Sequence, residues 1–571
     1  MAVVTSLVHT VLLASRWVCG RRVDPRRRHD RSEHGNGVAR VRGDRRCPGD
    51  RLRGHGHRRR RRSGGGVGAR RQDRRGPRRR GRVCGDGSHL RDHRGWSPAG
   101  AAKSQAGLRL LDRYPGPAVA APVRKGEELE LRVDSLAYGG NGVARHDGFV
   151  VFVRRALPGD TVRARVTKVK RGYAEASVSE VVEPGAGRVP AACEHFGLCG
   201  GCRFQDYAYE LQLAAKHDQV RDALVRLGGV AEPPLEPIVP ARSQLAYRNK
   251  LEYSFTHTAD GLGLGFHRAG RWDEVLDLRT CHLTTDLGNA IRATVRGWAR
   301  EEGLEAYDQN TQSGYLRHLV VREGRNTGQA LVMLVTAPGE RFDPDYLIET
   351  LRRFPEVRSI HWAVNDTPAE VTNLPSRLLW GEEWIEEEIL GLRFRVRPNA
   401  FLQTNTEMAE ELYRLAIAAA GLTGSETVYD LYCGTGTIGL ALAGKALTVW
   451  GIEISEEAVA CAIENAALNG VTNAAFFAGN VGQVLEELRE RAGDPDVVVV
   501  DPPRAGLAGK GLRRTGALGA PRLVYVSCNP TTLAGDLKVL RDEYGYTLRR
   551  CTPVDMFPHT PHIESVSLLE R

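Results

Sequence analysis

The C-terminal part of the chain, residues 397–571, alternates short apolar stretches with helical ones. Strands are expected at 427–432, 447–452, 474–478, 497–500, 524–527 and 564–569. Repeated strand–helix units predict a Rossmann-like α/β fold, in which a largely parallel sheet is covered by helices. Ligands bind beyond the carboxyl ends of the strands in such sheets, so the residues that follow each strand are candidates for a site.

The first of these strands ends in a glycine-rich loop. Residues 434–439 have the Gly-x-Gly-x-x-Gly form, and Glu453 ends the next strand. NAD and S-adenosylmethionine (SAM) both use such a turn together with an acid on the ribose, so the loop alone is a weak signal. Asp430 opens the loop as methyltransferases do, and Asp501 begins an Asp-Pro-Pro motif like those of base methyltransferases. These two features favour SAM over NAD.

A cysteine follows the strand expected at 524–527. Cys528 is followed by Asn529 and Pro530, which would end the strand and begin a helix. A thiol there would face the ligand-binding edge, and the amides of a helix N-terminus would favour its thiolate. We therefore interpret Cys528 as a covalent nucleophile, the alternative being an inert core thiol.

Residues 122–185 alternate apolar and polar side chains in four or five short stretches. Glycine-rich or proline-containing turns at 139–142 and 158–160 separate them, which predicts a small OB-like β-barrel. Cations and an aromatic ring gather at Lys168, Lys170, Arg171 and Tyr173. Proteins that bind single-stranded RNA combine the same groups, whereas the alternative is a solvated hairpin edge.

Four cysteines mark the middle of the chain, residues 186–396, for which strands and helices of an α+β domain are expected. Cys193, Cys199 and Cys202 lie close together, and Cys281 follows much later. Four thiolates can bind zinc or an iron–sulfur cluster. Zinc sites usually consist of two Cys-x-x-Cys pairs, so the three-plus-one spacing favours a [4Fe-4S] cluster over zinc or over unrelated buried cysteines.

Charge is distributed unevenly along the chain. Residues 1–121 hold 31 Lys and Arg against 9 Asp and Glu, whereas the remainder holds 50 against 60. This Arg-rich segment cannot bury enough apolar surface and is expected to be disordered. It is either a basic arm that binds RNA phosphates or, as we favour, the product of a translation start assigned too far upstream. No apolar run approaches the roughly 20 residues of a membrane helix, so we expect a protein that does not bind membranes. The cysteines do not form a disulfide framework, which favours the cytoplasm.

Several short motifs together resemble one family, the RNA uracil-5-methyltransferases that act on 23S rRNA and tRNA. The resemblance covers residues 122–571 and includes a TRAM domain, an RNA-binding module. The motifs that carry it are 139–142 with 152–160, the four cysteines, 401–403, 430–436, 501–504, 527–530 and 562–564. The Arg-rich segment is not part of the family pattern.

The resemblance implies a role for particular residues. Cys528 would be the nucleophile, Glu564 the base, and the four cysteines would hold a [4Fe-4S] cluster. The SAM contacts would be Gln403, Tyr432, Thr437, Glu453, Asn480 and Asp501. Thr437 stands where relatives often have Asn, which weakens its assignment.

The chemistry explains why a thiol and a carboxylate are needed. Addition of the Cys528 thiolate to C6 of uracil makes C5 nucleophilic enough to take the methyl group, and Glu564 then removes the C5 proton. The base must leave its stack to reach such a site. We expect a monomer that methylates 23S rRNA, with tRNA as the second candidate substrate. The motifs also leave open a methyltransferase for a base amino group, which needs no cysteine, and a non-catalytic RNA-binding protein.

Overall fold

The computed structural model describes residues 121–507 and 509–571. The predictions for the Arg-rich N-terminal segment lie outside these residues. Within the described part of the chain, no helix is both long and apolar enough to cross a membrane.

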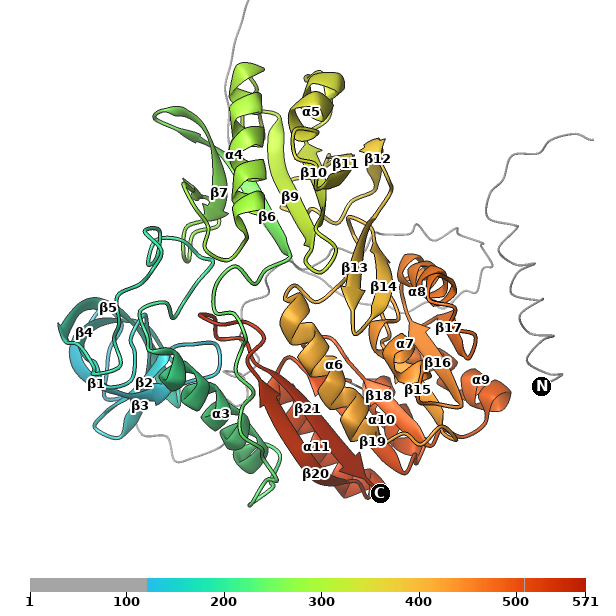
Figure 1. The fold of residues 1–571 in the computed structure, drawn as a ribbon. Helices are drawn as coiled ribbons and strands as arrows, with labels where there is room; N and C mark the ends of the chain where they lie inside the picture. Colours follow the sequence, from blue (N-terminus) through green and yellow to red (C-terminus); the bar gives the residue numbers. More distant parts are fainter. Residues whose placement is uncertain (1–120, 508) are drawn as a thin grey trace, which may run out of the picture. The chain divides into compact units, whose positions relative to one another are not determined.

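A closed barrel comes first in the described part of the chain (Figure 1). Its strands are β1 (Glu128–Leu136), β2 (Gly142–His146), β3 (Phe149–Arg154), β4 (Thr161–Val169) and β5 (Tyr173–Glu183), in the order β1-β2-β3-β5-β4. Burial alternates along β1, where Leu129, Leu131 and Val133 belong to the barrel core. The predicted OB-like barrel is confirmed, and helix α3 (Tyr209–Arg226) follows it in the chain.

The middle of the chain forms a seven-stranded sheet in the order β12-β11-β10-β9-β6-β7-β8. Its elements are β6 (Lys250–Thr258), β7 (Gly261–His267), β8 (Val275–Asp277), α4 (Asp286–Glu301), β9 (Leu316–Gly324), β10 (Gln329–Thr336), α5 (Pro344–Leu351), β11 (Val357–Val364) and β12 (Ser376–Gly381). Trp298 of α4 packs in one core with Leu319 of β9. Val320 and Met333 belong instead to the core of the C-terminal part. The two parts therefore share a packed interior.

The C-terminal part is a second seven-stranded sheet in the order β17-β16-β15-β18-β19-β21-β20, preceded by the hairpin β13 (Ile385–Ile389) and β14 (Leu392–Val396). Its strands are β15 (Thr427–Leu431), β16 (Thr448–Glu453), β17 (Ala474–Ala478), β18 (Val497–Val500), β19 (Arg522–Ser527), β20 (Thr547–Val554) and β21 (Glu564–Glu570). Strands β15 to β19 pair in parallel, and β21 is antiparallel to both of its neighbours. The Rossmann-like prediction is confirmed.

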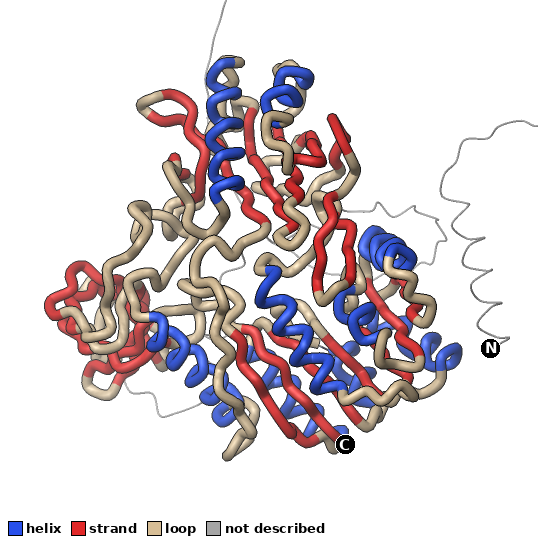
Figure 2. Tube along the Cα trace, in the orientation of Figure 1, coloured by secondary structure: helices blue, strands red, loops and turns tan. Residues whose placement is uncertain are grey.

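Helices cover both faces of this sheet (Figure 2). They are α6 (Thr406–Ala420), α7 (Thr437–Ala443), α8 (Glu456–Leu468), α9 (Val481–Ala492), α10 (Gly509–Ala517) and α11 (Pro530–Tyr544). Side chains of β18 point alternately to the two faces of the sheet, which explains the two layers of helices. Val497 and Val499 pack with α6 to α8, while Val498 and Val500 pack with α9 to α11. A strand that is apolar on both sides is what a sheet between two helical layers needs.

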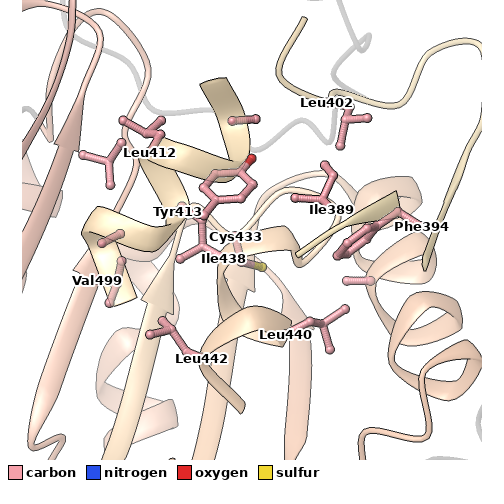
Figure 3. Close-up of a cluster of buried hydrophobic side chains, with 14 of the residues drawn as sticks. Ile389, Phe394, Leu402, Leu412, Tyr413, Cys433, Ile438, Leu440, Leu442 and Val499 are labelled. Atoms are coloured by element: carbon pink, nitrogen blue, oxygen red, sulfur yellow. The ribbon is translucent and has the colours of Figure 1, made fainter. Parts of the chain in front are cut away.

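The core beneath the glycine-rich loop is shown in Figure 3. Tyr413 of α6 and Ile438 of α7 lie there beside the thiol of Cys433. Cys433 is buried, and burial raises the pKa of its thiol well above the ordinary value. This thiol is therefore part of the hydrophobic packing that supports the loop.

Candidate active site

The strand ends predicted from the sequence meet at one edge of the C-terminal sheet. Parallel strands place Glu453, Asp501 and Cys528 at the carboxyl ends of β16, β18 and β19. Strand β21 runs the other way and begins at this edge with Glu564. We call these four residues the reactive edge. Ser527 pairs with Ser565, so Cys528 follows β19 directly beside the start of β21, at the strand spacing of about 4.8 Å.

Hydrogen bonds fix the main chain around Cys528. The hydroxyl of Ser527 accepts from the amide of Asn529 at 3.1 Å, and Asn529 caps α11 by accepting from the amide of Thr531 at 3.1 Å. The side-chain amide of Asn529 also donates to the carbonyl of Arg504 at 3.0 Å. Asn529 thus joins the end of β19 to the loop after β18, which explains why an asparagine follows the cysteine.

Burial raises the pKa of the Cys528 thiol to about 12, and the charges of Glu564 and Asp501 add to the effect. Arg504 acts in the opposite direction but does not outweigh them. Burial and these charges therefore oppose the ionisation that we expected the N-terminus of α11 to favour. A buried thiol beside carboxylates keeps its proton.

Glu564 and Asp501 also hold their protons more tightly than ordinary carboxyl groups. Burial raises the pKa of Asp501 to about 7, and burial followed by the charge of Asp501 raises that of Glu564 well above its usual range. Among the described residues, no cation forms an ion pair with Glu564. The reactive edge thus concentrates acidic groups in a place with little water, and a cation would be stabilised there.

Arg504 supplies a positive charge that acts on both Cys528 and Glu564. Its guanidinium donates to Nδ1 of His562 at 3.1 Å. Burial, then the charge of Arg504, lowers the pKa of His562 to about 4, so the imidazole is neutral and can accept this hydrogen bond. Arg504 and His562 belong to the motifs found in the sequence, although no role in the site was predicted for them.

The glycine-rich loop can take its shape only with glycines at particular places. Gly436 has φ +82°, and a Cβ there would lie 3.0 Å from the Cβ of Ala462. At Gly439 a Cβ would come within 2.7 Å of a carboxyl oxygen of Asp430. Glu453 accepts from the amide of Gly434 at 3.3 Å, so the predicted ribose acid lies against the loop. This is the arrangement that holds nucleotide-like ligands in doubly wound sheets.

Three further predicted SAM contacts come from segments near this loop. Thr437 is the first residue of α7 and donates to the hydroxyl of Tyr413 at 3.2 Å. Tyr432 follows β15 with φ +69°. Asn480 caps α9 through its side-chain oxygen, which accepts from the amide of Gly482 at 2.9 Å. A ligand would therefore be contacted by its side-chain nitrogen.

The segment of Gln403 reaches the same loop from the other side. The hydroxyl of Thr435 donates to the carbonyl of Phe401 at 3.4 Å, and the carbonyl of Gln403 accepts from the side chain of Asn249 at 2.9 Å. Gln403 is buried. Asn249 precedes β6, so the central sheet and the glycine loop are both tied to this segment.

The four predicted metal ligands line one small cavity of about 20 Å³. Burial is the main cause that raises the pKa of Cys199 to about 11 and that of Cys202 to about 12, and the other thiols add to it. Cys193 and Cys281 complete the lining. In the described part of the chain, however, no three His, Cys, Asp or Glu side chains are placed to share one metal ion. The thiols converge, but they do not form the tight tetrahedron of a zinc site.

One residue of this region was missed by the sequence analysis. The hydroxyl of Tyr138, in the turn between β1 and β2 of the barrel, donates to the carbonyl of Cys528 at 3.4 Å. The sequence showed only a glycine-rich turn at this place. Its one signal was an aromatic residue directly before the glycines.

Comparisons with known proteins identify the family. The family model for tRNA (uracil-5-)-methyltransferases matches residues 377–571, and the model for the TRAM domain matches residues 122–179. An uncharacterised RNA methyltransferase of Halalkalibacterium halodurans is 40% identical over 452 residues, which cover 79% of this chain and 98% of the relative. One from Clostridium tetani is 39% identical over 456 residues, covering 79% of this chain and 99% of the relative.

A solved structure has a similar fold. It is the tRNA (uracil-54, C5)-methyltransferase of Pyrococcus abyssi in complex with S-adenosyl-L-homocysteine. The two chains are 29% identical with a TM-score of 0.62, and the match covers 77% of this chain and 100% of the other.

Proposed function

We propose that this chain, which belongs to the RNA uracil-5-methyltransferase family, methylates C5 of a uridine through a covalent adduct on Cys528. The observation that carries the proposal is the pairing of β19 with β21, which sets Cys528 beside Glu564 at the edge that also bears the glycine-rich loop. A methyltransferase for base amino groups would need the loop and the Asp-Pro-Pro motif, but no thiol beside a buried carboxyl.

The reaction follows from the groups at the reactive edge. SAM supplies the methyl group and a sulfonium charge. The Cys528 thiol loses its proton to water and its sulfur bonds to C6 of uracil, which moves the C5–C6 electron pair toward O4. C5 then takes the methyl group from the sulfur of SAM, which leaves as S-adenosylhomocysteine. Glu564 removes the C5 proton, the double bond re-forms, and the bond between sulfur and C6 breaks, which restores the thiolate.

The acidic character of the edge explains how a protonated thiol can start this sequence. A positive charge near Asp501 and Glu564 favours their ionised forms and that of Cys528. The high pKa of Cys528 therefore keeps the thiol unreactive until the site is filled. Glu564, buried and without an ion pair among the described residues, is then available to accept the C5 proton.

We further propose that the substrate is 23S rRNA, which the barrel and the central part of the protein bind. The protein would act as a monomer in the cytoplasm. The TRAM-like barrel and the four cysteines support rRNA by family resemblance. A tRNA is the second candidate, because the solved relative from Pyrococcus abyssi acts on tRNA. The division into domains at 122–185, 186–396 and 397–571 belongs to the same proposal.

The four cysteines fit a [4Fe-4S] cluster better than zinc. Each thiolate of such a cluster binds a different iron, so four thiols around one cavity suffice without the spacing of a single-ion site. Cys193, Cys199, Cys202 and Cys281 would hold it. Nothing at this cavity assigns the group a part in methyl transfer, and we propose a structural role.

RNA that contains 5-fluorouridine tests the proposal. Fluorine at C5 cannot be removed as a proton, so the enzyme with SAM should form a stable protein–RNA adduct, and Cys528→Ala should form none. Methyl transfer at full rate by Cys528→Ala would favour amino-group methylation. Absence of label from SAM in both rRNA and tRNA would favour a non-catalytic RNA-binding protein.

A further inference from the structure

The turn between β1 and β2 brings the barrel to the reaction centre. The Tyr138 hydroxyl donates to the main-chain carbonyl of Cys528 at 3.4 Å, across 390 positions of sequence. The side chain is partly buried. Burial raises its pKa to about 12, and the charges of Arg504, Cys528 and Glu564 all act on it. Tyr138 therefore lies among the groups of the reactive edge and stays a hydrogen-bond donor in neutral solution.

The same turn also touches the segment that leads to Glu564. Gly140 has φ +81°, and a Cβ there would lie 2.8 Å from the ring of Phe204 and 3.0 Å from the Cβ of Pro561. Beside it, Arg203 donates to the side-chain oxygen of Asn141 at 2.8 Å. Turn 137–141 is thus held on one side by Cys528 and on the other by the residues just before β21.

We infer that Tyr138 is a positioning residue of the reaction centre. By holding the Cys528 carbonyl it directs the thiol, and it thereby couples the position of the barrel to formation of the covalent adduct. The inference rests on the proposed function. Rotation of the Cys528 peptide would swing the side chain away from the line on which sulfur meets C6. Ser527 accepts from the N–H of this same peptide, the amide of Asn529, and the Asn529 side chain donates to Arg504. Tyr138 holds the other end of the peptide, the carbonyl of Cys528.

Two different roles for Tyr138 would give different results. If the ring only bound RNA, its loss would weaken RNA affinity and leave the chemical step unchanged. If it only filled space, Tyr138→Phe would behave like the wild type, because only the hydroxyl is removed. A positioning role predicts a slower chemical step with unchanged RNA affinity, already in Tyr138→Phe.

The experiment uses the full-length protein, SAM and an RNA that contains 5-fluorouridine. The rate of adduct formation is measured in a single turnover with saturating enzyme, and the RNA dissociation constant is measured separately. Tyr138→Phe should slow the adduct about three- to tenfold, as loss of one hydrogen bond does, with the dissociation constant within about twofold of the wild type. Tyr138→Ala should be at least as slow.

Two further variants serve as controls for this measurement. Arg145→Ala removes an exposed cation of the same barrel, paired with Asp134 at 3.4 Å, and should leave the adduct rate unchanged. Gly140→Ala keeps the tyrosine but presses a methyl group against Phe204 and Pro561, and should also slow the adduct. Thermal unfolding confirms that each variant is folded.

The outcomes separate the inference from the function on which it rests. A wild-type rate in folded Tyr138→Phe overturns the inference, and so does a defect confined to the dissociation constant, while the wild-type adduct still supports the function. If the wild type forms no adduct yet transfers methyl groups, the covalent mechanism and the inference both fail.

Discussion

The thiols of Cys528 and Cys202 lie in two different regions of the molecule but have nearly the same pKa, about 12 in each case. Burial is the main cause in both. The other causes differ. At Cys528 the charges of Glu564 and Asp501 raise the pKa and Arg504 lowers it, whereas at Cys202 a hydrogen bond from Gln205 lowers the pKa and three other thiols raise it. A raised thiol pKa therefore does not distinguish a nucleophile from a metal ligand. In the roles that we propose, a neighbouring cation would stabilise the thiolate of Cys528, whereas a metal would replace the proton of Cys202.

Removal of the reactive thiol tests this comparison most severely. Cys528→Ala should lower methyl transfer from SAM to RNA by about four orders of magnitude, because no other group at the edge can add to C6. Cys461→Ala is the matched control, since its buried thiol accepts from Arg397 at 3.2 Å and lies outside the reactive edge. Equal losses in both variants would contradict the special role of Cys528.

The carboxyl beside the thiol should give the next largest effect. Glu564→Gln keeps the size of the side chain but cannot take up the C5 proton, so turnover should fall about 10²- to 10⁴-fold. The methylated adduct should accumulate on ordinary uridine RNA, where it can be seen as a slowly migrating band in a denaturing gel. Wild-type turnover without such a band would mean that another group removes the proton.

The pH dependence of thiol reactivity sharpens the comparison further. Without SAM, alkylation of Cys528 by iodoacetamide should rise about tenfold per pH unit between about pH 7 and 9, because the thiolate is the minor form far below a pKa of about 12. The rate is obtained by subtracting that of Cys528→Ala. A plateau within this range would show that the thiol is already ionised and that the carboxyl groups do not control it.

The smallest effect on chemistry is expected from the four-cysteine cavity. Cys202→Ser should abolish the visible absorbance and the bound iron of anaerobically purified protein, yet slow adduct formation by no more than about tenfold, since the cavity lies outside the reactive edge. Cys551→Ser, at a fully buried thiol elsewhere, should keep the absorbance. Zinc in place of iron in the wild type would contradict the cluster.

These regions also differ in how far the sequence determines them. Gly436, Asp501 and Cys528 could be predicted as site candidates, because each follows a strand and the edge of a parallel sheet brings strand ends together. The contact of Tyr138 could not be predicted, since it joins residues 390 positions apart through the seating of one folded part on another. The groups that raise the pKa of Cys528 could not be predicted for a related reason: the helix N-terminus is local, but the carboxyl groups come from the ends of β18 and β21.

The cysteines lie between these two cases. Spacing placed three thiols near one another and left Cys281 to be brought in by the fold, and all four do line one cavity. Zinc and iron–sulfur clusters use the same thiolates and differ in how far apart they hold them. Our proposal of a cluster therefore depends on the placement of the described thiols, no three of which are set to share one ion.

The place of β21 has a consequence for how the protein matures. It pairs with β19 on one side and β20 on the other, yet it follows both in the chain. Strands β19 and β20 do not pair with each other, because β21 lies between them. Cys528 and Glu564 therefore become neighbours only when the last strand is in place. On the proposed mechanism, a chain in which β21 has not yet paired would carry the thiol without its base.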